Sequence, residues 1–156
     1  GMASTDTRAA DTFTEFFATY EPRLRHPLVA RCGAEVGREA TADALEYAWS
    51  HWDRVGSMAH PAAYLYRVGQ SASRRYRRPQ GTTGELRVSA TPWFEPALEP
   101  AVARLSDRQR VAVVLRHSFG YRFDEIADVM GISISSVQKH IDRGHDKLRR
   151  KLEASS

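Results

Sequence analysis

The side chains best suited to a chemical role in this sequence surround Gly131, which separates two short helical patterns. Ala127 is small at a point where two helices must approach closely, and Gly131 can take the positive φ of a tight turn. Ser133 follows at a position where its hydroxyl can cap the second helix. This spacing predicts a helix-turn-helix, with helices over residues 123–130 and 134–153 that share an apolar core.

The second of these helices carries short polar and basic side chains on the side that its apolar residues leave exposed. Such side chains reach base edges and phosphates in a DNA groove, and the first turn of the helix offers N–H groups to a phosphate. A helical hairpin with a merely solvated charged face is the alternative. The residues predicted to contact DNA from this helix are Ser133, Ser135, Ser136, Gln138, Lys139 and Arg143.

A second candidate for nucleic-acid binding is the stretch from residue 64 to residue 78, which combines aromatic side chains with five arginines. On one helix, aromatic rings can stack on unpaired bases while arginines hold the backbone, which suits single-stranded nucleic acid. The alternative is that Tyr64, Leu65 and Val68 belong to the core and the arginines are only solvated. The candidate contacts are Arg67, Arg74, Arg75, Tyr76, Arg77 and Arg78.

Other kinds of site find little support in the sequence. Cys32 is the only cysteine, so no intramolecular disulfide and no multi-thiolate metal site can form. His140 and His145 are five residues apart and share no helical face. There is no glycine-rich phosphate loop and no G-x-S-x-G nucleophile motif. We therefore predict a protein that is not an enzyme and holds no metal or cofactor, whereas the net charge of +4 favours a polyanionic partner.

The elements that position the arginine-rich helix are predicted to lie between residues 12 and 78, and all of them are helical. A stripe of aromatic and leucine residues predicts a first helix, with Thr12 and Glu15 at capping-box spacing. Pro22 and Pro27 are predicted to kink or split this helix, because a proline removes one backbone hydrogen bond and crowds the preceding turn.

A turn over residues 33–37 is expected next, followed by a helix whose apolar stripe runs to Val55. This helix displays more large aromatic surface than one helix of a small domain easily buries, so a protein partner and core packing are both open. Core packing is favoured for Trp52, and Trp49 is left to either interpretation. Pro61 is predicted to open a third helix.

Residues 79–97 are rich in proline, glycine, threonine and serine without periodicity, and we interpret them as a flexible linker. A second unit is predicted over residues 98–153, where Ser106 and Gln109 have capping-box spacing before a helix. The expected fold class is all-α, with two small helical domains joined by the linker.

Four stretches of the second unit resemble region 4 of the extracytoplasmic-function (ECF) sigma factors of bacterial RNA polymerase. They are Leu105–Val111, Phe119–Ala127, Val137–Ile141 and Lys147–Arg149. The order of a basic aromatic helical unit, a linker and a helix-turn-helix is also that of the family, and the resemblance covers about residues 12–152. The sequence departs from the usual family pattern at Ala42, Leu45, Ser71 and Arg122.

The resemblance implies a sigma factor, with core RNA polymerase, promoter DNA and an anti-sigma factor as partners. Residues 12–78 would be the region 2-like domain, which docks on the polymerase clamp through Leu45, Glu46 and Trp49 and holds the melted −10 strand. The turn over residues 56–60 would lie near a captured non-template base, and residues 98–153 would read the −35 element.

A stand-alone helix-turn-helix regulator is the rival hypothesis. It would bind operators as a dimer without polymerase and would need a self-complementary surface, for example through Trp49 and Trp93. The chain shows no signal-peptide pattern and no apolar run long enough to cross a membrane, so we expect a cytoplasmic protein without membrane insertion.

Overall fold

The structure is a computed structural model, and it describes residues 2–76 and 99–155. Within these two ranges every regular element is a helix, which confirms the all-α fold class. The helices are α1 (Met2–Cys32), α2 (Ala34–Ser50), α3 (Trp52–Val55), α4 (Pro61–Ser73), α5 (Glu99–Ala103), α6 (Asp107–His117), α7 (Phe123–Met130) and α8 (Ile134–Ser155).

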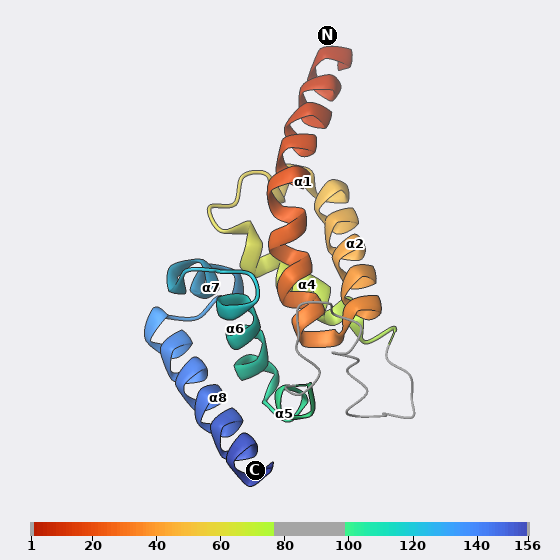
Figure 1. Ribbon diagram of the computed structural model, residues 1–156. Helices are drawn as coiled ribbons and strands as arrows, with labels where there is room; N and C mark the ends of the chain where they lie inside the picture. The colour runs from red at the N-terminus through yellow and green to blue at the C-terminus, as the bar shows by residue number, and fades with distance from the viewer. Residues whose placement is uncertain (1, 77–98, 156) are drawn as a thin grey trace.

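The first helix is longer than predicted, and it is not split. α1 runs as α-helix from Met2 through both prolines to Cys32, with Thr12 inside it, so Thr12 does not cap its start. Leu24, between the two prolines, and Leu28, directly after the second, are fully buried. We attribute the continuity to this burial, which offsets the lost backbone hydrogen bonds. The first turns of α1 project beyond the other helices (Figure 1).

The turn between the first two helices is shorter than expected. Gly33 alone reverses the chain, with a positive φ of 92°, and α2 begins at the next residue. Gly37 lies inside α2, where a Cβ atom would stand only 2.5 Å from the Cα of Val29. The glycine therefore lets α2 lie against the end of α1, and the predicted turn over residues 33–37 is wrong beyond Gly33.

The remaining helices of residues 2–76, which we call the first half, differ in part from the prediction; residues 99–155 are the second half. α2 ends at Ser50, and a separate short helix, α3, carries the chain to Val55. α4 begins at Pro61 as predicted but ends at Ser73, so the arginine-rich stretch is not one helix to residue 78. The predicted linker, residues 79–97, lies outside the described residues, as do Arg77 and Arg78.

The helix-turn-helix forms as predicted. α7 has the predicted bounds, and Gly131 ends it in the left-handed conformation, with φ 68°. The Ser136 N–H donates to Ser133 Oγ at 3.1 Å, so Ser133 caps α8. The predicted capping box forms at the start of α6. The Gln109 N–H donates to Ser106 Oγ, and the Ser106 N–H donates to Gln109 Oε1, both at 3.2 Å.

The two halves pack against each other, with α6 beside the C-terminal end of α1 and α7 beside α4 (Figure 1). Arg110 of α6 is buried and donates to the main-chain oxygens of Ala30 and Arg31, both at 2.9 Å. His26 of α1 stacks on Phe119 with ring centroids 3.8 Å apart. The buried apolar residues of both halves consequently form one continuous core.

Among the described residues, no helix is both long enough and apolar enough to cross a membrane.

Candidate functional site

The exposed face of α8 carries the side chains that the sequence assigned to DNA contact. Ser133, Ser135, Gln138, Lys139 and Arg143 are exposed, and Ser136 is partly exposed. The opposite side of the helix is anchored in the core, with Val137 fully buried and Ile141 4% exposed. The apolar face therefore fixes the rotation of α8, and the polar face points away from the protein.

Three serine hydroxyls form a small polar cluster at the start of α8. Ser133 Oγ lies 3.1 Å from Ser135 Oγ and donates to Ser136 Oγ at 3.0 Å. Each hydroxyl can exchange these contacts for an acceptor on a base or a phosphate, because it both donates and accepts. The cluster also lies at the positive end of the helix dipole, which favours an anion.

The start of α7 is held by charged side chains. The Arg122 N–H donates to Glu125 Oε1 at 2.9 Å, and the Arg122 guanidinium pairs with Asp124 at 3.1 Å. This hydrogen bond lowers the pKa of the Asp124 carboxyl. Glu125 thus supplies the half of a capping box that accepts the N–H of residue 122.

The arginine-rich stretch divides between core and surface. Leu65 is fully buried, whereas Arg67, Arg74 and Arg75 are exposed. Tyr76 is partly buried, and its hydroxyl donates to Asp43 Oδ2 at 2.7 Å, a hydrogen bond that raises the pKa of the phenol. Base stacking on Tyr76 would therefore compete with an existing contact to α2.

A second polar aromatic cluster joins α2, α3 and α4. The hydroxyls of Tyr47 and Tyr64 lie 2.8 Å apart, and the Arg54 guanidinium donates to both of them. The hydrogen bond to Tyr64 is the main reason that the pKa of Tyr47 is raised. His51 stacks on Tyr47 with ring centroids 4.0 Å apart. These side chains fasten the short helix α3, and with it the start of the turn over residues 56–60, to the rest of the first half.

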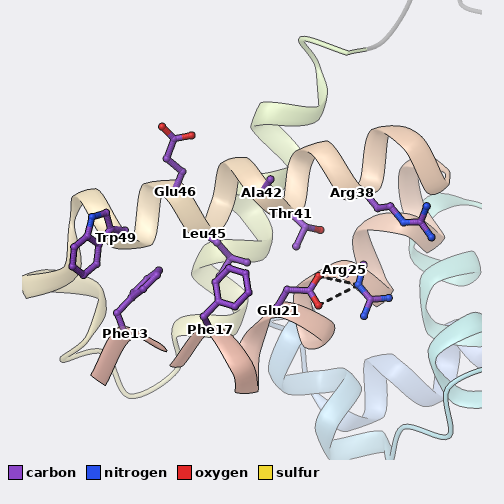
Figure 2. A pocket seen from close by; sticks show the side chains of 10 residues that line it. All are labelled: Phe13, Phe17, Glu21, Arg25, Arg38, Thr41, Ala42, Leu45, Glu46 and Trp49. Atoms are coloured by element: carbon purple, nitrogen blue, oxygen red, sulfur yellow. Dashed lines mark hydrogen bonds and ion pairs between the residues drawn. The ribbon is translucent and has the colours of Figure 1, made fainter. Parts of the chain in front are cut away.

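An apolar groove of about 500 Å³ runs between α1 and α2 (Figure 2). Leu45 is 3% exposed on its floor, and Trp49, 47% exposed, stands at one end, 5.0 Å from the ring of Phe13. The ion pair between Glu21 and Arg25, at 2.9 Å, borders the other end. The lining residues are Phe13, Phe17, Glu21, Arg25, Arg38, Thr41, Ala42, Leu45, Glu46 and Trp49.

The comparisons with known proteins bear on both halves of the chain. Residues 97–148 match the sequence model of the family described as "Sigma-70, region 4". The matched segment, called region 4 below, includes α5, α6, α7 and most of α8. No curated protein sequence matches the chain.

Two solved structures resemble the fold of the whole chain. One is the sigma factor RpoE in complex with the anti-sigma factor NepR from Bartonella quintana, at 19% identity and a TM-score of 0.57, covering 92% of this chain and 98% of that one. The other is CnrH in complex with the cytosolic domain of CnrY, at 23% identity and a TM-score of 0.61, covering 95% and 96%. The predicted resemblance to ECF sigma factors is therefore confirmed, by the match of residues 97–148 to the family model and by the likeness in fold.

The structure places the predicted site residues in three separate surfaces. The α8 residues share one exposed face of region 4, and the described arginines of the stretch from residue 64 lie on and just after α4. Leu45 and Trp49 line the groove, and Glu46 is exposed at its rim (Figure 2).

Sequence reasoning missed the contribution of α1 to the groove. Phe13 and Phe17 belong to the aromatic stripe that predicted the first helix, yet Phe17 is 44% exposed and both rings line the groove. A signal was present, because three phenylalanines within five residues exceed what a narrow buried stripe accommodates.

Proposed function

We propose that this protein is a sigma factor that binds core RNA polymerase and directs initiation at selected promoters. The observation that carries the proposal is the exposed polar face of α8 within a region 4 domain. The polymerase would catalyse RNA synthesis, so this chain would catalyse no reaction itself. A protein with this role would act in the cytoplasm.

The groove between α1 and α2 is the proposed docking surface for the polymerase clamp. An exposed tryptophan beside an apolar groove is typical of the residues that dominate binding energy at protein interfaces. Trp49 and Leu45 would provide the apolar contact, and Glu46 a polar contact at the rim. Residues 12–78 would form the polymerase-binding domain.

Region 4 is proposed to read the −35 element in the duplex major groove. Gln138 can form a bidentate contact with a base edge, whereas Lys139 offers a point charge to a phosphate. Ser133, Ser135, Ser136 and Arg143 would complete this surface.

The basic surface at the end of α4 is proposed to hold the melted −10 strand. Arg67, Arg74 and Arg75 are exposed and can neutralise backbone phosphates. Tyr76 could stack on a base after releasing its contact with Asp43, and Arg77 and Arg78 would extend the positive charge.

An anti-sigma factor is proposed as a further partner. Both similar structures are complexes, one with the anti-sigma factor NepR and one with the cytosolic domain of CnrY. The groove is apolar and carries the exposed Trp49, so it is the first place to look for competition between such a partner and the polymerase.

Co-purification with bacterial core RNA polymerase tests the docking proposal. Trp49→Ala should weaken the complex by about 2 kcal/mol or more, which is about 30-fold in affinity. Leu152→Ala is the matched control, because Leu152 is also an exposed apolar residue, 45% exposed, but lies on α8 away from the groove. A parent protein that binds no polymerase yet forms a dimer on palindromic DNA would favour the stand-alone regulator instead.

A promoter-library assay tests the reading of the −35 element. Gln138→Ala should change the preferred −35 sequence and cost about 1 to 3 kcal/mol at the preferred base, whereas Lys139→Ala should weaken all sequences alike. An unchanged preference in the Gln138 variant would contradict the base contact.

For the −10 strand, Arg74→Ala should weaken open-complex formation more than Arg23→Ala does. Arg23 is the control because it is an exposed arginine of α1.

A further inference from the structure

Two histidines of region 4 face each other across α6 and α8. The Nε2 atoms of His117 and His145 lie 2.7 Å apart, and the ring centroids are 4.9 Å apart at an angle of 43°. We propose that this pair is a two-histidine site for a transition-metal ion that favours imidazole nitrogen, such as Zn²⁺ or Ni²⁺.

The backbone holds the two rings at this separation. A Cβ atom at Gly144 would lie 2.7 Å from Cγ2 of Val113, so α8 can approach α6 this closely only because residue 144 is a glycine. His145 is the next residue on α8, and His117 follows Val113 by one helical turn on α6. Val113 is 5% exposed, so both histidines stand on helices that are fixed in the core. A site on rigid elements loses little entropy when it binds an ion.

The pair is suited to the neutral form that a metal ion requires. Two nitrogens 2.7 Å apart can share one proton between them, but they cannot each carry one along the same line. Partial burial lowers the pKa of His117, and the nearby His145 and Arg116 lower it further. Imidazole binds metal through its neutral nitrogen, and two nitrogens this close cannot both hold a proton between them, so one of them is free to bind.

Only a small rearrangement converts the contact into a chelate. Two nitrogens that each lie about 2.0 to 2.1 Å from one tetrahedral Zn²⁺ are about 3.3 Å apart. The nitrogens of the pair would therefore separate by about 0.6 Å. Ring rotation alone can supply a movement of this size, because the side chain turns about two dihedral angles.

The surroundings leave room for the ion and for water. His117 is exposed and His145 is partly exposed. Arg116 is turned to other partners, because it donates to the Tyr121 carbonyl at 3.0 Å and lies over the Phe123 ring. No group of three or more His, Cys, Asp or Glu side chains gathers in the described ranges. Water or a side chain of a bound partner would complete the coordination, and we expect micromolar rather than nanomolar affinity.

Calorimetric titration of the full chain, without a histidine tag, with Ni²⁺ and with Zn²⁺ tests the site. The parent should bind one ion and unfold at a higher temperature in its presence. His117→Ala and His145→Ala should each weaken binding by about tenfold or more and abolish that temperature rise. His51→Ala, which removes an exposed histidine of the first half, should change neither.

A further variant separates metal binding from simple hydrogen bonding. Gln in place of His145 keeps a side chain that can hydrogen-bond to His117 but does not readily bind Zn²⁺ or Ni²⁺. His145→Gln should therefore unfold like the parent in the absence of metal and bind no ion. Ion binding as tight in either alanine variant as in the parent, or a parent that binds no ion, would overturn the proposal. These readouts do not involve polymerase or DNA, so they are independent of the proposed function.

Discussion

Replacement of Arg110 by methionine should separate the two halves of the protein and destabilise it. The guanidinium is 2% exposed and donates to four acceptors at the junction. It bonds to the carbonyls of Ala30 and Arg31 at 2.9 Å each, to the Leu105 carbonyl at 3.0 Å, and to Asp107 Oδ1 at 2.6 Å. Methionine keeps most of the apolar stem and volume but donates no hydrogen bond.

The size of the effect follows from the burial of these acceptors. A hydrogen bond to a charged group contributes about 1.5 to 3 kcal/mol, and removing one partner of a buried ionic network costs about 3 to 5 kcal/mol. For a chain of this size, 1 kcal/mol shifts the melting temperature by about 2 to 4 °C. Arg110→Met should therefore lower it by about 6 to 20 °C.

Thermal unfolding followed by circular dichroism measures this loss, and small-angle X-ray scattering reports whether the halves separate. Arg108→Met is the matched control, since Arg108 lies on the same helix but is exposed. The reasoning would be refuted if the melting temperatures of the two variants differed by no more than about 2 to 4 °C, which corresponds to about 1 kcal/mol of unfolding free energy. An unchanged radius of gyration would show that the other contacts suffice to hold the halves together.

Three further predictions concern the same packing. The pKa of His26 is lowered to about 4, chiefly by burial and further by Arg25, while Glu21 opposes the shift. The free energy of unfolding should therefore fall as the pH drops from about 6.5 toward about 4. His26→Gln should reduce that loss, as measured by urea unfolding. Gly37→Ala should cost about 1 to 3 kcal/mol of unfolding free energy, because its Cβ would meet the backbone of α1. Ser106→Ala should cost about 1 kcal/mol in the same assay, because α6 loses its cap.

Each of these predictions has an outcome that would contradict it. The acid destabilisation should persist in His51→Gln, which changes an exposed histidine; equal pH profiles for the two histidine variants would count against His26. Gly37→Ala could gain up to about 1 kcal/mol from helix propensity, so a net stabilisation would mean that α1 can move aside. A Ser106→Ala variant as stable as the parent would show that the cap is dispensable.

The sequence predicted the helix-turn-helix closely because its signals are local. Gly131 supplies the left-handed turn, Ser133 caps α8, and the pair Ser106 and Gln109 closes the start of α6, all within a few residues of one another. The exposed face of α8 then followed from the buried positions at Val137 and its neighbours. Each of these features depends on helix geometry rather than on distant parts of the chain.

Predictions failed where distant residues decide the structure. Pro22 and Pro27 were expected to interrupt the first helix, but the helix is continuous, which we attribute to the burial of the leucines next to them. Gly37 was read as part of a turn, although its role is a close approach between two helices. The contact of His26 with Phe119 joins residues that lie far apart in the sequence, and no local pattern announces it.

The junction at Arg110 also bears on how this protein can change during evolution. Its two acceptors on α1 are the main-chain carbonyls of Ala30 and Arg31, which every amino acid provides. Side chains at the end of α1 can therefore drift without removing these acceptors, whereas the donor depends on one arginine. The tolerance to mutation of these two hydrogen bonds is one-sided, because a new sequence at the end of α1 would still provide both acceptors.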